Sequence, residues 1–149
     1  MFLITYQRVT FLLKILSCTE MLDTNTCIYI MNQKPEHVTR RFEENLAEEM
    51  AISTISYGEL LFGAYKSQSH QKAIHKLESF IGSVPPLPLP SHVAEYYGKI
   101  RLALEKKGKS IGGNDLWIAA HALSLNLTLI TNNGKEFKRI AELKIENWC

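Results

Sequence analysis

The chain has 149 residues and a formal net charge of +2, from 17 basic and 15 acidic side chains. That length suits one compact domain with a single core and excludes two ordinary domains. Apolar residues make up 46% and charged residues 21%, which excludes a disordered tail. The small positive charge permits an anionic partner without demanding one. No apolar run reaches the roughly 18 residues that a membrane span needs, so no membrane partner is expected.

The three cysteines are odd in number and lack the spacing of a zinc site. Cys18, Cys27 and Cys149 therefore argue against a disulfide framework. They fit a protein of the reducing cytoplasm.

Residues 1–20 differ from the rest, because they form an apolar stretch broken only by Arg8 and Lys14. No basic residue precedes the apolar region, so the stretch makes a poor signal peptide. Two interpretations stay open. The segment is either an irregular extension packed on the domain, or upstream sequence translated from an early start codon, with Met21 as the true first residue.

From Met21 onwards, short strands alternate with helices. A short strand ends at Leu22, and Asp23, Thr24 and Asn25 then supply N-cap chemistry for a helix. The later elements expected are a helix from Pro35 that carries Leu46, a strand at 50–54, helices at 56–66 and 70–80, a proline-rich edge strand or extended connection at 84–90, a helix that Ser91 caps and Gly108 ends, a helix that Asn114 caps, a strand at 127–131, a short helix at 136–140 and a last strand at 144–146. Strands separated by helices predict a three-layer α/β/α domain over residues 21–149, with a short, mainly parallel central sheet.

Three acids follow predicted strands, and the carboxyl ends of parallel strands are where sites gather in such sheets. Asp23 follows the first strand, Glu59 is expected in the first turn of the helix after the second, and Asp115 opens a helix after a glycine turn. Each alone has an ordinary explanation, as a helix cap, a solvated helix residue or a complement to a helix dipole. Together they favour a site, because Glu59 lies in a largely apolar helix where an unpaired carboxylate is costly.

Asn133 adds a fourth oxygen donor at the end of the strand at 127–131. Ligands that are all oxygen favour Mg²⁺ or Mn²⁺ over zinc. Such a cluster hydrolyses phosphodiesters by binding one or two metal ions, which activate a water and offset charge on the leaving oxygen.

These residues resemble the PIN-domain family and, within it, the VapC-type toxins of bacterial toxin–antitoxin pairs. The resemblance spans residues 21–149 and rests on four ordered segments and a closing IENWC: MLDTNTCIYI, SYGELLFGA, NDLWIAAHA and TLITNNGKEF. Asp23, Glu59 and Asp115 match the family's acidic triad. Its fourth acidic position falls on Asn133, so one charge is missing there, and Glu136, one helical turn on, is a candidate substitute.

The resemblance implies an Mg²⁺- or Mn²⁺-dependent endoribonuclease that acts on structured RNA such as tRNA or rRNA. Asp23 and Asp115 would be direct metal ligands, Glu59 a ligand or an orienter of the attacking water, and Asn133 a group that acts through water. It also implies a homodimer and a hetero-oligomer with a VapB-like antitoxin. We expect the antitoxin grooves between the helices at 25–41 and 56–66.

A non-catalytic module of the same fold, which binds RNA or protein, is the alternative. Three mutually repelling carboxylates argue against it, because a module that does not cleave has no reason to keep them. Basic side chains that could contact phosphates are Lys34, Arg40, Arg41, Lys106, Lys107 and Lys109.

Overall fold

The computed structural model describes residues 2–149, with side chains from Thr5 onwards. Its elements in chain order are α1 (Phe2–Ser17), β1 (Glu20–Leu22), α2 (Thr24–Asn32), α3 (Glu36–Glu44), the 3₁₀ helix η1 (Ala47–Glu49), β2 (Met50–Ser53), α4 (Thr54–Lys66), α5 (His70–Ser83), β3 (Pro86–Leu87), α6 (Val93–Lys106), α7 (Gly113–Ser124), β4 (Thr128–Ile130), α8 (Gly134–Phe137) and β5 (Ile145–Glu146). The predicted alternation of strands and helices is confirmed.

The five strands form one sheet in the order β3-β2-β1-β4-β5, and every neighbouring pair is parallel. The proline-rich segment contributes only the two-residue β3 at one edge, as expected for residues that cannot donate to a central ladder. The central strands β1, β2 and β4 are largely buried, as in sheets covered by helices on both faces, whereas the edge strand β5 is only partly buried.

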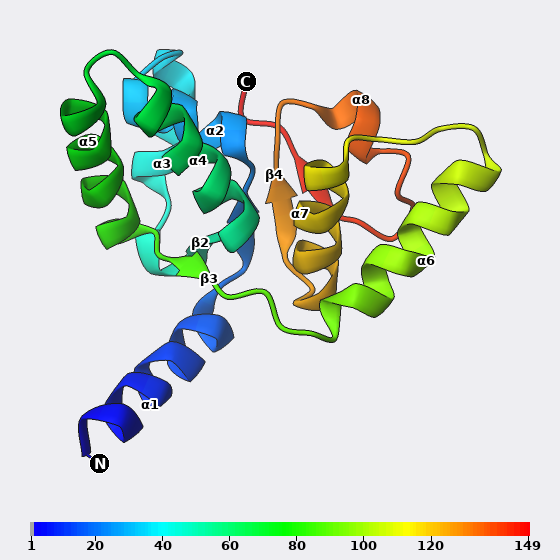
Figure 1. The fold of residues 1–149 in the computed structure, drawn as a ribbon, viewed down its shortest axis with the longest axis horizontal. Coiled ribbons are helices and arrows are strands. Elements are labelled where there is room, and N and C mark those ends of the chain that lie inside the picture. The colour runs from blue at the N-terminus through cyan, green and yellow to red at the C-terminus, as the bar shows by residue number, and fades with distance from the viewer. Residues whose placement is uncertain (1) are drawn as a thin grey trace.

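Alternate residues of the central strands pack on opposite faces of the sheet. Met21, Ala51 and Leu129 belong to one core cluster, which includes residues of α6 and α7. Leu22, Ile52 and Ile130 belong to the other, with residues of α2, α3, α4 and α5. The period of two along a strand thus divides the core into two layers and confirms the three-layer architecture (Figure 1).

The strand order reverses beside β1, the position at which open parallel sheets generally have a crevice. The chain moves from β1 to β2 and then to β3 on one side, and β4 pairs with β1 on the other side. Open parallel sheets bind ligands at the carboxyl ends of strands where the strand order reverses. In this sheet that point lies between β1 and β4.

Four local expectations are corrected by the structure. Helix α7 begins at Gly113 with Gly112 as its N-cap, so Asn114 lies inside the first turn. Helix α6 has His92 at its N-cap in place of Ser91. Leu46 lies beyond the end of α3 and is 58% exposed. Helix α4 begins at Thr54 because the Ser53 side chain caps Ile55 N, which moves Glu59 from the first turn to the second.

The N-terminal segment is helical and not irregular. Figure 1 shows α1 projecting away from the rest of the molecule. Its last turn is attached to η1, because Lys14 Nζ donates to the carbonyls of Ala47 at 3.1 Å and Glu48 at 2.9 Å. Within residues 2–149, the helices are too short or too polar for any of them to cross a bilayer.

Candidate active site

Asp23 is fixed at the carboxyl end of β1, where the strand order reverses. Its backbone N–H donates to Ile130 O of β4 at 3.0 Å, and its side chain accepts from Thr26 N at 2.8 Å as the N-cap of α2. The predicted cap is confirmed. The side chain is only 5% exposed, so the fold holds a carboxylate in a site with little water. Such burial is costly unless hydrogen bonds or a cation meet the charge.

Glu59 reaches the same place from the second turn of α4. The Thr24 hydroxyl Oγ1 donates to Glu59 Oε1 at 2.6 Å and so joins the first turn of α2 to α4. A short hydrogen bond to a carboxylate fixes its orientation. Thr24 therefore positions one oxygen of Glu59 beside Asp23.

Asp115 completes the group from the first turn of α7. Burial, followed in order of effect by the nearby charges of Glu59, Glu136 and Asp23, raises the pKa of Asp115 to about 6. Like charges raise a carboxyl pKa only when they lie close by in a poorly screened environment. The structure therefore brings the three acids selected from the sequence together, with Glu136 as a fourth.

Asn133 and Glu136 act as a pair. Asn133 Nδ2 donates to Glu136 Oε2 at 2.9 Å, and Asn133 N donates to the hydroxyl of Thr131 at 2.9 Å. Asn133 occupies the position at which the resemblance places a fourth acid. Its side-chain amide thus holds the carboxylate of Glu136. The sequence names both residues, but only the structure shows that one orients the other.

The donor set suits a hard divalent cation. The carboxylates of Asp23, Glu59, Asp115 and Glu136 offer only oxygen, which Mg²⁺ and Mn²⁺ prefer, and the charges of the other three contribute, after burial, to the raised pKa of Asp115. Across residues 2–149, no three His, Cys, Asp or Glu side chains already stand within reach of a single ion. The carboxylates are therefore near enough to influence the pKa of Asp115 but are not all within reach of one ion.

Two of the side chains predicted to contact phosphates form ion pairs within the protein. Arg41 forms an ion pair with Glu146 and lies over the ring of Trp148, and Arg40 pairs with Glu36 at 3.3 Å. Lys106, Lys107 and Lys109 are exposed at the end of α6 and in the connection to α7. This connection runs to the first turn of α7, which carries Asp115 (Figure 1).

A groove of about 430 Å³ extends from Glu59 between α2, α4 and α5. Its lining is largely apolar, with Ile28 and Leu60 among its walls, and Lys72 and Lys76 come from α5. We expected grooves between the helices at 25–41 and 56–66; the groove does lie between α2 and α4, but its lining includes residues of α5 and none of α3. The sequence pattern did not indicate that α5 would line this groove. Two lysines four residues apart beside apolar positions were the available signal.

Comparisons with known proteins agree with the fold. The family described as PIN domain matches residues 21–143. The chain is 43% identical over 129 residues to "Ribonuclease VapC1" of Haemophilus influenzae, covering 86% of this chain and 96% of that protein. It is also 43% identical to the "tRNA(fMet)-specific endonuclease VapC" of Salmonella typhimurium, covering 87% and 97%.

Two solved structures share the architecture. VapBC2 from Rickettsia felis, bound to a DNA fragment from its promoter, matches with a TM-score of 0.82 and 42% identity over 88% of this chain and 99% of that one. DNA-bound VapBC from Salmonella typhimurium matches with a TM-score of 0.83 and 42% identity over 89% and 99%. Both structures share the fold over most of this chain.

Proposed function

The chain belongs to the PIN-domain family, and we propose that it is an Mg²⁺- or Mn²⁺-dependent endoribonuclease, the toxin of a toxin–antitoxin pair. One observation carries the proposal: Asp23, Glu59 and Asp115 converge from three elements beside the carboxyl end of β1, with Glu136 close enough to raise the pKa of Asp115. The names of the ribonuclease relatives support the same activity.

In this proposal Asp23 and Asp115 hold the metal. When bound, Mg²⁺ or Mn²⁺ activates a water for attack on the phosphorus and offsets charge on the leaving oxygen. Asp23 is preorganised for this task by its bond to Thr26 N, which leaves the carboxylate little rotational freedom. Asp115 must be ionised to bind a cation, so its raised pKa makes metal affinity fall in acid.

Glu59 and the Asn133–Glu136 pair complete the arrangement. Thr24 holds Glu59 Oε1, and we assign the other carboxylate oxygen to the metal or to the attacking water. Asn133 orients Glu136, and both act through water at the margin of the site. Glu136 thereby supplies the fourth charge that Asn133 lacks.

Structured RNA, tRNA or rRNA, is the proposed substrate. The name of the Salmonella relative favours tRNA as the first to test. Lys106, Lys107 and Lys109 are the basic side chains available for phosphate contacts near Asp115. We place the reaction in the cytoplasm, because Cys18, Cys27 and Cys149 are all unpaired thiols.

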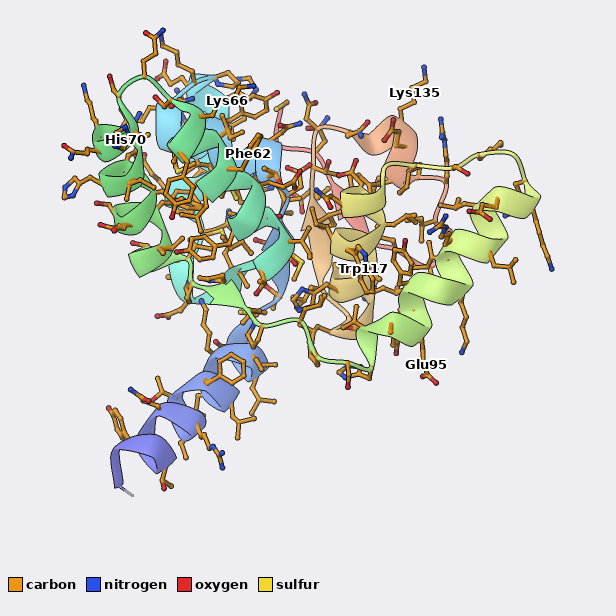
Figure 2. All side chains as sticks on the ribbon, in the orientation of Figure 1. Phe62, Lys66, His70, Glu95, Trp117 and Lys135 are labelled. Carbon is orange, nitrogen blue, oxygen red and sulfur yellow. The ribbon has the colours of Figure 1, made fainter. Side chains whose placement is uncertain are left out.

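A VapB-like antitoxin is the proposed partner, and the groove beside Glu59 is its proposed seat. An apolar segment would pack on Ile28 and Leu60, and a basic side chain at its end would meet the carboxylates. The solved relatives of Rickettsia and Salmonella are VapBC complexes, which supports this partner. Phe62 and Tyr65, 67% and 66% exposed on α4, are apolar surface available to a second copy in a homodimer and in the hetero-oligomer (Figure 2).

The test is cleavage of total cellular RNA, purified tRNA and purified rRNA by the isolated protein with Mg²⁺, with Mn²⁺ and with a chelator. We expect discrete fragments that need the metal. Asp23→Asn and Asp115→Asn should each lower the cleavage rate by more than about a hundredfold, since each removes a metal ligand.

Glu95→Gln is the matched control, because Glu95 is exposed and lies on α6 away from the carboxylates (Figure 2). It should cleave at the rate of the unmodified protein. A folded, antitoxin-free protein that cuts no RNA would favour the non-catalytic binding module. Cleavage that persists in both aspartate variants would show that these residues do not carry the reaction.

A further inference from the structure

A cavity of about 250 Å³ lies beside the acidic site, between the second half of α6 and the first turn of α7. Gly113 and Leu116 line it from α7, and these two residues flank Asp115 in the chain. Figure 1 shows the connection from α6 to α7 crossing the edge of the molecule at which β4 and α8 also end. Asp115 therefore lies in the same helical turn of α7 as two residues of the cavity's lining.

One aromatic side chain, Tyr97, lines the cavity, and Trp117, which is not among the lining residues, supports the Tyr97 ring. The ring of Tyr97 stacks on Trp117 with centroids 4.0 Å apart and an angle of 14° between the planes. Figure 2 shows Trp117 on the side of α7 that faces α6. Both rings are half-buried, so their orientation is set by packing in the protein. An aromatic ring held in this way offers a surface on which a flat base can stack.

Polar groups stand beside the Tyr97 ring in a fixed pattern. Arg101 Nη1 donates to Tyr97 Oη at 3.0 Å, and Arg101 Nε donates to Glu105 Oε1 at 2.8 Å. The cavity thus has a guanidinium donor and a carboxylate acceptor next to each other. Every nucleobase carries a flat π-face and an edge with hydrogen-bonding groups, which is the chemistry this lining complements.

The rim of the cavity is held in place and carries positive charge. Arg139 Nη1 donates to Ser110 O at 3.0 Å, which fastens the connection between α6 and α7 to the segment after α8. Gly108 turns the chain at the end of α6 with φ +62°, a left-handed conformation that glycine adopts without strain. Lys107 and Lys109 lie exposed in the same connection, where an RNA backbone would find cations.

We propose that this cavity binds one unpaired nucleobase of the RNA, from a nucleotide that flanks the scissile phosphate. The inference rests on the proposed ribonuclease function and deepens it. A base can enter only if it is splayed out of a helix, so the cavity selects single-stranded loops over duplexes. Glu105 and Arg101 then discriminate among bases through the edge that faces them.

Ser110→Leu is the main test, because Ser110 is exposed at the rim and leucine would fill the cavity without changing charge. Binding of a labelled single-stranded oligoribonucleotide is measured by fluorescence anisotropy in chelator, which prevents metal-dependent cleavage. We expect Kd to rise about tenfold, the loss of one stacked base. Binding of a duplex of the same sequence should not change.

Glu105→Gln is the second variant and Glu95→Gln its matched control on the same helix. Glu105→Gln should alter which base precedes or follows the cut in a pool of RNA fragments, since it replaces an acceptor-only group with a donor and an acceptor. Glu95→Gln should leave both the affinity and the pattern of cuts unchanged.

The outcomes separate this inference from the proposed function. A Ser110→Leu variant that binds the single strand as tightly as the unmodified protein overturns the cavity assignment, even if the protein cuts RNA. An unmodified protein that does not bind the single strand overturns it as well. A protein that binds through the cavity and cuts nothing would retain the cavity assignment and refute the nuclease.

Discussion

Helices α1 and α7 are both apolar in sequence, yet they differ in what covers them. Six residues of α7 are buried, and the helix packs on α6, α4 and the sheet. In α1, Leu16 is 82% exposed and Leu13 60% exposed, and the last turn is hydrogen-bonded to η1 through Lys14. The PIN domain matches residues 21–143 and so leaves α1 outside it. The comparison teaches that apolar composition produces a helix locally, but burial depends on whether the fold offers a face for it.

A matched pair of truncations would test this difference most strongly. Ile118 of α7 is 1% exposed, so Ile118→Ala should lower the free energy of unfolding by about 2–5 kcal/mol. Leu13→Ala in α1 should change it by less than about 0.5 kcal/mol. Chemical denaturation measures both. A large loss for Leu13→Ala would mean that α1 is packed in solution, for instance against another copy.

The buried histidine of α7, His121, should make the stability of the protein depend on pH in acid. His121 is fully buried with Nδ1 2.9 Å from Ser53 Oγ, and burial, with nearby His92, lowers its pKa to about 4. The unfolded chain takes up this proton below about pH 6.5 and the folded chain does not, so stability falls as the pH drops towards 4.

When the pH is lowered from about 7 to about 4.5, His121 alone should reduce the free energy of unfolding by about 2 kcal/mol. His121→Gln should remove that acid-dependent loss, whatever its effect on stability at neutral pH. Equal pH slopes for the two proteins would contradict the lowered pKa.

Asp115 lies at the other end of α7 from His121, and its effect on the pH dependence of stability should have the opposite sign. Its pKa is raised to about 6, so the folded protein holds a proton that the unfolded chain releases above about pH 4. Its cost to stability is therefore absent below pH 4 and fully present above pH 6. In chelator near pH 7, Asp115→Asn should stabilise the protein by about 1 kcal/mol, reduced from the full shift because the side chain is half-buried.

Added metal should reverse the stability advantage of Asp115→Asn. Mg²⁺ should raise the melting temperature of the unmodified protein, because binding to the folded state alone stabilises it. It should raise that of Asp115→Asn much less. Equal responses of the two proteins to Mg²⁺ would speak against Asp115 as a ligand.

The attachment of α1 should give the smallest effect. Lys14→Ala removes two hydrogen bonds to carbonyls of η1 and should cost up to about 1 kcal/mol. Arg8→Ala, an exposed change in the same helix, is the control and should cost nothing measurable. A melting temperature that is the same for both would mean that the last turn of α1 is not held against η1.

The carboxylates were predictable from the sequence for a physical reason. Asp23 follows a buried strand and Glu59 lies in an apolar helix after another, and parallel strands bring such positions to one edge. The roles of Asn133 and Glu136 were not decidable, because they depend on how α8 leaves β4 and on a hydrogen bond between two side chains. The stack of Trp117 on Tyr97 joins α7 to α6 and needed the structure.

The sequence alone determined the alternation of strands and helices, the parallel sheet and the three acids of the site, because hydrophobic period and capping residues act within a few residues of the chain. Tertiary structure alone decided the strand order that reverses beside β1, the pairing of Asn133 with Glu136, and the cavity between α6 and α7. Those features join residues far apart in the chain, and their energies depend on distances and burial that local pattern does not contain.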